Sequence, residues 1–197
     1  MPELRRLKLQ PDHRFAFLQG FLERPKEVGS IIPSSRFLER RIVRAARVEN
    51  AKVIVELGPG TGGTTRALLR AMRPDAHLLS VEVNPRFVDL LKKIDDPRLL
   101  VHLGSAAEIR ATLDRYELAA PNVILSGIPF STIARQAGRD ILRSVHDSLP
   151  SGGLFVAYQV RDRVESLGRE VFGRARVQTE IFNVPPMRVY RWEKAVP

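Results

Sequence analysis

The stretch that decides the fold is Glu56-Leu57-Gly58-Pro59-Gly60-Thr61-Gly62. It follows a short β-branched run, residues 52–57 (KVIVEL), and leads into residues 61–72, whose apolar positions have helical spacing. Glycines at such a junction let the backbone turn sharply and pass close to a ligand. They also place free amides at a helix N-terminus. The stretch therefore predicts a ligand-binding loop between a buried strand and a helix.

Strands and helices alternate outward from this loop. The expected strands are residues 52–57, 77–83, 99–103, 122–126 and 153–160, and the expected helices are residues 61–72, 85–93, 106–114 and 134–149. This alternation predicts an α/β fold with a parallel sheet and helices on both faces. Residues 176–182 and 188–192 are two further strand-like runs, too close together for a helical crossover, so they should pair antiparallel. Five parallel strands and a C-terminal antiparallel hairpin are typical of the Rossmann-like class I methyltransferase sheet.

The N-terminal part differs from this pattern. Asp12 is a candidate cap for a helix that runs to Arg24 and is ended by a proline. A second helix, residues 36–48, follows two serines that are candidate caps. On it, four arginines spaced by four, four and three form one basic stripe: Arg36, Arg40, Arg44 and Arg47. We expect residues 1–50 to form a helical cap on a core of residues 51–197, in one compact domain.

Composition excludes several classes of protein. The chain has 197 residues, of which 44% are hydrophobic and 27% charged, so wholesale disorder is excluded. No apolar run is long enough for a membrane-spanning helix, and the N-terminus lacks the apolar stretch of a signal peptide. The absence of cysteine excludes disulfide scaffolds, thiol nucleophiles and cysteine-ligated metal sites, and it fits a cytoplasmic protein.

The formal net charge of +10 is concentrated at the two ends of the chain. Residues 1–50 hold 11 Lys+Arg against 6 Asp+Glu, and residues 161–197 hold 8 against 5, so the middle is nearly balanced. Such a distribution fits a polyanionic partner, either a nucleic acid or an anionic lipid surface. The alternative to a polyanionic partner is that the arginines only keep the surface soluble.

Two cofactors use a glycine loop of this kind. Gly58, Gly60 and Gly63 satisfy the dinucleotide fingerprint, a weak signal when it stands alone. Glu56, two positions before the first glycine, favours S-adenosylmethionine instead. A carboxylate there helps the cofactor's ammonium and sulfonium groups, directly or through water, whereas it would repel a pyrophosphate. Glu82 ends the second strand and suits a ribose diol, since one carboxylate accepts from both hydroxyls.

Later loops should complete the pocket, because ligands lie at the carboxyl ends of parallel strands. A small polar residue after the third strand, Ser105, suits the adenine amino group. The loop after the fourth strand, residues 126–130 (SGIPF), is where methyl transfer is expected. The candidate cofactor-binding residues are Ser34, Glu56, Gly58, Pro59, Gly60, Thr61, Gly62, Glu82, Val83, Asn84, Ser105, Ala106 and Ser126. The candidate catalytic residues are Ser126, Pro129, Phe130 and Tyr158, with Phe130 packing on the substrate nitrogen or the cofactor.

Together these segments resemble a known family. The segments that carry the resemblance are residues 29–40 (GSIIPSSRFLER), 53–69 (VIVELGPGTGGTTRALL), 80–91 (SVEVNPRFVDLL) and the SGIPF loop. The chain is similar in them to bacterial phospholipid N-methyltransferases, including ornithine-lipid N-methyltransferases, whose core resembles that of ribosomal RNA adenine dimethylases. The resemblance implies S-adenosylmethionine as cofactor and S-adenosylhomocysteine as product. It also implies an N-terminal segment that folds over the cofactor and touches the bilayer.

Two departures count against an RNA substrate. RNA adenine dimethylases have an asparagine at the start of the loop that corresponds to SGIPF, and its side chain can hold the adenine amino group. Ser126 is shorter and has one donor. Those enzymes also carry a further RNA-binding domain, whereas this chain ends at the hairpin. An RNA adenine-N6 or small-molecule N-methyltransferase stays the alternative, followed by a dinucleotide-binding or non-catalytic protein.

The expected reaction is an SN2 transfer of methyl to a lipid primary amine, that of phosphatidylethanolamine, toward phosphatidylcholine. No side chain is an obvious base. Surface or packing roles are expected for the four histidines, of which His102 also lies beside the third-strand loop: His13, His77, His102 and His146. Tyr158 is a candidate for orienting the amine, and no metal cluster is expected. The basic N-terminal helices predict a cytoplasmic protein that attaches peripherally to the inner membrane surface.

Overall fold

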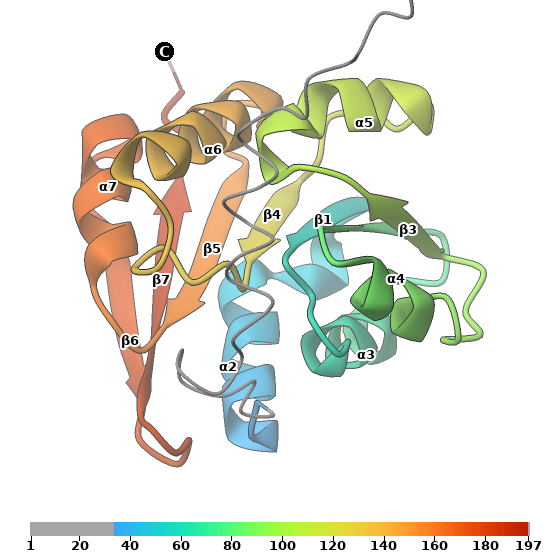
Figure 1. Ribbon diagram of the computed structural model, residues 1–197, viewed down its shortest axis with the longest axis horizontal. Coiled ribbons are helices and arrows are strands. Elements are labelled where there is room, and N and C mark those ends of the chain that lie inside the picture. Colours follow the sequence, from blue (N-terminus) through green and yellow to red (C-terminus); the bar gives the residue numbers. More distant parts are fainter. Residues whose placement is uncertain (1–33, 197) are drawn as a thin grey trace, which may run out of the picture.

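The computed structural model describes residues 34–196, which form one seven-stranded sheet with helices on both faces (Figure 1). The strands lie in the order β3-β2-β1-β4-β5-β7-β6. Their bounds are β1 Val53–Leu57, β2 His77–Glu82, β3 Leu99–Leu103, β4 Val123–Ser126, β5 Leu154–Gln159, β6 Arg176–Glu180 and β7 Met187–Glu193. The first five are parallel, and β7 pairs antiparallel with both β5 and β6. The α/β fold and the C-terminal hairpin that the sequence predicts are thereby confirmed.

Residue alternation along the strands divides the core in two. Val53, Val55 and Leu57 of β1 face one apolar cluster, which α5, α6 and α7 cover. Ile54 faces the other cluster, which α2 and α3 cover. The helices are α2 Arg36–Ala46, α3 Gly63–Ala71, α4 Pro85–Leu91, α5 Ile109–Arg115, α6 Arg135–Ser148 and α7 Arg163–Phe172, with 3-10 turns η1 Val48–Asn50 and η2 Ala106–Glu108.

Three details differ from the sequence expectations. The hairpin does not extend the sheet in chain order, because β7 lies between β5 and β6 and leaves β6 at the edge. Helix α7 was not expected, and the helix expected over residues 106–114 is divided into η2 and α5. Helix α2 is part of the core, since Leu38 and Ile42 are fully buried against the sheet, whereas Phe37 is 43% exposed.

The expected helix over residues 12–24 lies outside the described residues, and the proposed boundary at residue 50 stays a prediction. None of the described helices is both long enough and apolar enough to cross a bilayer.

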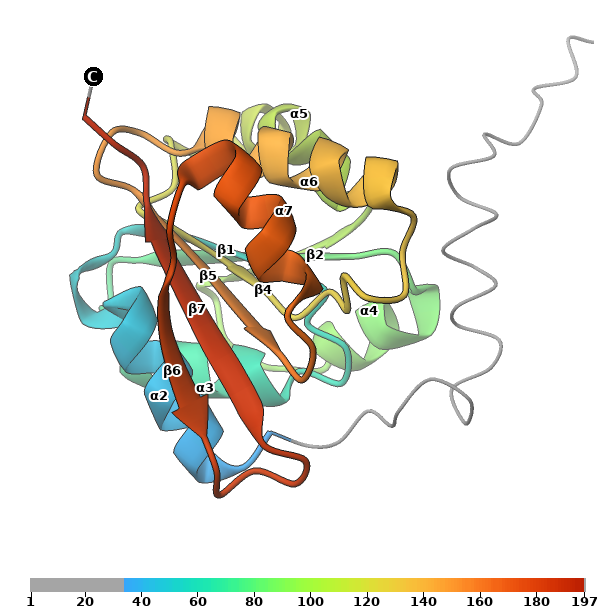
Figure 2. The ribbon, with the colours of Figure 1, turned by 90° about the vertical axis from the view of Figure 1, so that its left-hand side faces the viewer.

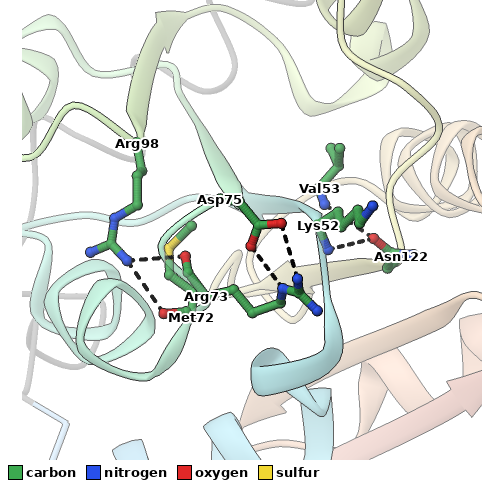
Figure 3. Close-up of polar contacts among 7 residues, drawn as sticks. All are labelled: Lys52, Val53, Met72, Arg73, Asp75, Arg98 and Asn122. Carbon is green, nitrogen blue, oxygen red and sulfur yellow. Dashed lines mark hydrogen bonds and ion pairs between the residues drawn. The ribbon is translucent and has the colours of Figure 1, made fainter.

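The amino ends of the strands are fastened by polar contacts that serve the fold (Figure 3). Asn122, just before β4, accepts hydrogen bonds from the amides of Lys52 and Val53 at the start of β1. The Arg98 guanidinium donates to the carbonyls of Leu69, Met72 and Arg73, which end α3. A cation at a helix C-terminus satisfies carbonyls that the helix itself cannot. The opposite edge, where the parallel strands end, is therefore the edge at which to look for a site.

Candidate active site

The loops that follow β1 and β4 meet at this carboxyl edge. Leu57 and Ser126 are paired neighbours at the ends of their strands, and Ser126 pairs in turn with Ala157 of β5. A Cβ on Gly127 would lie 2.6 Å from the Tyr158 hydroxyl and 2.8 Å from the Gly58 carbonyl oxygen. The sheet thus brings the glycine loop, the SGIPF loop and Tyr158 to one place, as expected for a cofactor beside an acceptor.

The glycine loop has the conformation that only glycine adopts readily. Gly58, Gly60 and Gly62 have φ angles of +68°, +57° and +82°. A Cβ on Gly60 would meet no atom within 4 Å, so the backbone borders open space there. The amides of Gly58, Gly60 and Gly62 serve the loop itself, since they donate to Val81 O, Glu82 Oε2 and Pro59 O, respectively.

Glu56 is fully buried beneath the glycine loop. Its Oε2 accepts hydrogen bonds from Thr65 Oγ1 at 2.6 Å and Ser80 Oγ at 3.0 Å. Oε1 is buried and has no hydrogen-bond partner among the described residues. Burial raises the pKa of Glu56 to about 7, the two hydroxyls oppose this rise, and nearby Glu82 adds to it. A buried, unsatisfied carboxylate oxygen fits a cationic group or a bridging water at this point.

Glu82 fastens the glycine loop to β2. Its Oε2 accepts from the Gly60 amide at 3.1 Å, and its Oε1 accepts from the amides of Val83 and Asn84, both at 2.9 Å. Burial raises the pKa of Glu82, and these three amides oppose that rise. A carboxylate has about four acceptor positions. Glu82 could therefore accept from a ribose hydroxyl with its remaining position while its other positions hold the loop.

The other candidate cofactor residues flank this edge. Asn84 caps α4 by accepting from the Arg86 amide, and Ser105 caps η2 by accepting from the Ala107 amide. Ser34, which lies just before the cap of α2, is half-buried, and Thr61 in the glycine loop is exposed. Pro59 and Ala106 are buried, and Val83 is half-buried. Their contacts with a cofactor remain predictions.

Two expectations for the SGIPF loop change. Phe130 is completely buried in the core beneath α6 and α7, so its ring anchors the loop instead of packing on an acceptor or cofactor. Ser126 is also fully buried, and its Oγ accepts from the Ile128 amide at 3.3 Å. Pro129 is half-buried, and its carbonyl accepts from the amide and hydroxyl of Thr132. The loop is held by its own contacts.

Gln159, at the end of β5, is a residue that the sequence reasoning missed. Its buried carboxamide donates to the Ile128 carbonyl and accepts from the Phe130 amide at 3.2 Å. Both contacts join it to a loop that is distant in sequence. A glutamine in an apolar strand is the only sequence signal, and it does not identify a partner. Gln159 is thus a positioning residue for the SGIPF loop, which we call the acceptor loop because the methyl acceptor is expected beside it.

We expect Gln159→Leu to lower kcat while the affinity for S-adenosylmethionine stays within about twofold. Leucine fills a similar volume but leaves two buried loop groups unsatisfied, at about 1–3 kcal/mol each. Steady-state kinetics and calorimetry with the cofactor separate the two effects. Gln136→Leu on the exposed face of α6 is the matched control. Equal loss of kcat and cofactor affinity would show a general structural role.

Tyr158 and His102 are unsuited to act as the base. Burial, with the Glu56 carboxylate nearby, raises the pKa of Tyr158 above its ordinary value, so the phenol keeps its proton. His102 ends up on β3, separated from β4 by β2 and β1, where its ring lies against Gly104 and the Tyr116 hydroxyl. Burial lowers the pKa of His102. Within residues 34–196, no group of three or more acidic or histidine side chains is arranged to hold a metal ion.

Comparison with known proteins fits this geometry. No family model matches the chain. The ornithine lipid N-methyltransferase of Singulisphaera acidiphila is 29% identical over 179 residues, which cover 89% of this chain and 93% of that protein. The ribosomal RNA small subunit methyltransferase A of Phenylobacterium zucineum is 37% identical over 98 residues, 48% of this chain and 32% of that protein.

Among solved structures, the 1,6-didemethyltoxoflavin-N1-methyltransferase of Burkholderia thailandensis aligns with a TM-score of 0.68 at 15% identity, over 97% of this chain and 93% of that one. That likeness shows the fold. Fold and sequence matches together confirm the predicted class: the chain is an S-adenosylmethionine-dependent methyltransferase. The predicted resemblance to ornithine-lipid N-methyltransferases, with a core similar to that of ribosomal RNA methyltransferases, is also confirmed.

Proposed function

We propose that the protein transfers a methyl group from S-adenosylmethionine to the primary amine of a phospholipid head group, with phosphatidylethanolamine as the acceptor. The observation that carries the proposal is the similarity to an ornithine lipid N-methyltransferase along 93% of that protein's length. The site is compatible with it, because the glycine loop and the acceptor loop meet at one edge of the sheet.

The chain's own residues supply binding and positioning. When bound, S-adenosylmethionine supplies an electrophilic methyl group on a sulfonium. Glu56 offers its unsatisfied oxygen to a cationic group, and Glu82 shapes the loop toward the ribose. An ammonium cannot attack, so the lipid amine must react in its neutral form. With Tyr158 protonated, its hydroxyl can accept from the amine N–H, and the rate rests on positioning and desolvation.

The acceptor loop favours a lipid amine over adenine. Ser126 stands where RNA adenine dimethylases present asparagine, and its hydroxyl is used by the Ile128 amide. The loop therefore presents no side-chain amide that would hold a base edge. The competing candidate, an RNA adenine-N6 or small-molecule N-methyltransferase, is favoured by the local match to the ribosomal RNA enzyme.

Peripheral attachment to the inner membrane surface completes the proposal. Arg36, Arg40, Arg44 and Arg47 are all exposed on or just after α2, as the sequence predicts for a basic stripe. Only those of the four cations that come close to an anionic surface add to its attraction, by about 1 kcal/mol each. Residues 1–33 of the N-terminal segment that the resemblance implies to touch the bilayer lie outside the described residues.

Transfer of a labelled methyl group tests the choice of acceptor. The protein is incubated with radiolabelled S-adenosylmethionine and either total lipid extract or total RNA. We expect label in the amine lipids. A heat-inactivated sample is the blank, and label in RNA alone would contradict the proposal.

A further inference from the structure

The turn between β6 and β7 carries an exposed apolar cluster. Ile181, Phe182 and Val184 are 66%, 67% and 82% exposed. Phe37, at the start of α2, is 43% exposed and lies with its ring centroid 5.4 Å from that of Phe182. We call these four residues the apolar tip. Single exposed apolar residues are ordinary, but a contiguous group marks a surface that meets an apolar partner.

The apolar tip is built into the fold. Asn183, only 1% exposed in the middle of the turn, accepts from the Ser35 amide and donates to the Pro185 carbonyl. Glu180, which ends β6, accepts from the Phe182 amide and pairs with Arg41 of α2 at 2.8 Å. The turn and the start of α2 are therefore held together (Figure 2). Within the turn, the side chains of Glu180 and Asn183 are buried, while those of Ile181, Phe182 and Val184 are exposed.

The tip lies at the same edge of the sheet as the candidate active site. Arg188, the second residue of β7, pairs with Gln159 at the carboxyl end of β5. Because β7 runs antiparallel, the turn that precedes it extends past the edge where the glycine loop and SGIPF loop meet. A surface that receives the tip thus lies at the end of the strands where the acceptor loop is found.

Cationic side chains stand beside the tip. Arg36 lies 5.7 Å from the centroid of the Phe37 ring, and Arg40 follows one turn later. An open groove of about 360 Å³ continues from them between α2 and α3, lined in part by Arg44 and Arg70. Apolar side chains bordered by arginines match the acyl and phosphate layers of an anionic membrane.

We propose that the apolar tip inserts into the interface of an anionic membrane and that Arg36 contacts lipid phosphates beside it. The choice of a membrane as partner rests on the proposed function; the surface itself rests on the contacts above. Helix α2 leads away from the tip, since Arg41 contacts Glu180 and Gln178 while Arg47 lies near Arg191. Arg44 follows Arg36 by eight residues, about 12 Å along the helix, which exceeds the Debye length of about 8 Å at physiological ionic strength.

Co-sedimentation of the full chain with phosphatidylglycerol–phosphatidylcholine vesicles tests the surface. These vesicles hold no primary-amine lipid, so the result is independent of the acceptor. We expect Ile181→Ser/Phe182→Ser to weaken partitioning by about tenfold or more, and Val177→Ser, on exposed β6 away from the tip, to leave it unchanged. Arg36→Gln should weaken it about fivefold and Arg44→Gln much less. Docking through the whole basic stripe predicts equal effects of the two arginines and would overturn the proposal.

A second readout reports insertion without removing the apolar surface. Phe182→Trp in a Trp192→Phe background should show a blue-shifted emission on the vesicles and quenching by brominated acyl chains. If residues 1–33 or a second copy cover the tip instead, the emission is already blue-shifted without vesicles and brominated lipid does not quench it. Either of those results contradicts insertion, whether or not methyl transfer to lipid is observed.

Discussion

Glu56→Gln should weaken binding of S-adenosylmethionine by about tenfold to a hundredfold, the range for a lost hydrogen bond to a charged group. Oε1 of Glu56 is buried with no partner among the described residues, so a ligand cation or its bridging water meets the ionised carboxylate there. Glutamine keeps an acceptor for the Thr65 and Ser80 hydroxyls, and the loop should therefore survive. Calorimetric titration measures the loss, and the exposed Glu49→Gln is the matched control. Unchanged affinity in Glu56→Gln would remove Glu56 from the cofactor site.

The pH dependence of the same variant gives an independent test. Burial raises the pKa of Glu56 to about 7, so ionising it costs the folded state. Stability conferred by the protonated form is full at low pH and is lost as pH rises toward 7, by up to about 3 kcal/mol relative to Glu56→Gln. Cofactor affinity should change in the opposite direction, rising between pH 6 and 8 with release of a proton. Thermal unfolding and titration in two buffers measure these trends, and equally steep trends in the variant would contradict the assignment.

Gly127→Ala should lower kcat/KM by about a hundredfold or more, because small displacements at a site can cost that much. The new methyl group would lie 2.8 Å from the Gly58 carbonyl oxygen and 2.6 Å from the Tyr158 hydroxyl. The first contact is with backbone that cannot rotate away, so the glycine loop and acceptor loop must separate. Overpacking of this kind costs about 1–3 kcal/mol of stability. Kinetics together with thermal unfolding measure both effects.

Two controls locate the cause of the Gly127→Ala defect. Adding Tyr158→Phe removes the hydroxyl clash but not the carbonyl clash, so the double variant should not recover. Gly63→Ala places its methyl group 3.9 Å from Glu39 Oε1, with nothing closer, and should keep its activity. That second result would also disfavour a dinucleotide fingerprint, in which the third glycine is needed for close packing of helix on strand. Recovery in the double variant would assign the defect to Tyr158 alone.

The sequence predicted the fold from local signals and missed what depends on distant contacts. The strands of the parallel sheet were predictable because short apolar runs alternate with helical spacing around the glycine loop. Helix α7 was missed because Gly168 interrupts its pattern, and the reason for that glycine is tertiary: a Cβ there would lie 2.4 Å from the Trp192 ring. The antiparallel hairpin was predictable from the short gap, but the insertion of β7 beside β5 was not.

The site divides in the same way. Glu56 and Glu82 were predictable as carboxylates at the ends of two strands, and the structure places both at the glycine loop. That Phe130 faces the core and that Gln159 holds the loop follow from contacts with α6, α7 and β5, which no local pattern encodes. The apolar tip is formed by the β6–β7 turn and the start of α2, which are remote in sequence. The sequence therefore indicated only the basic stripe beside the tip.

The most direct measurement of the central claim is mass spectrometry of a defined acceptor. Purified protein and S-adenosylmethionine are incubated with vesicles of phosphatidylethanolamine and phosphatidylglycerol, and Glu56→Gln serves as the matched variant. We predict head groups heavier by one or more methyl groups, formed faster by the wild-type chain than by the variant. Phosphatidylethanolamine that stays unmodified while the same preparation methylates RNA would contradict the account.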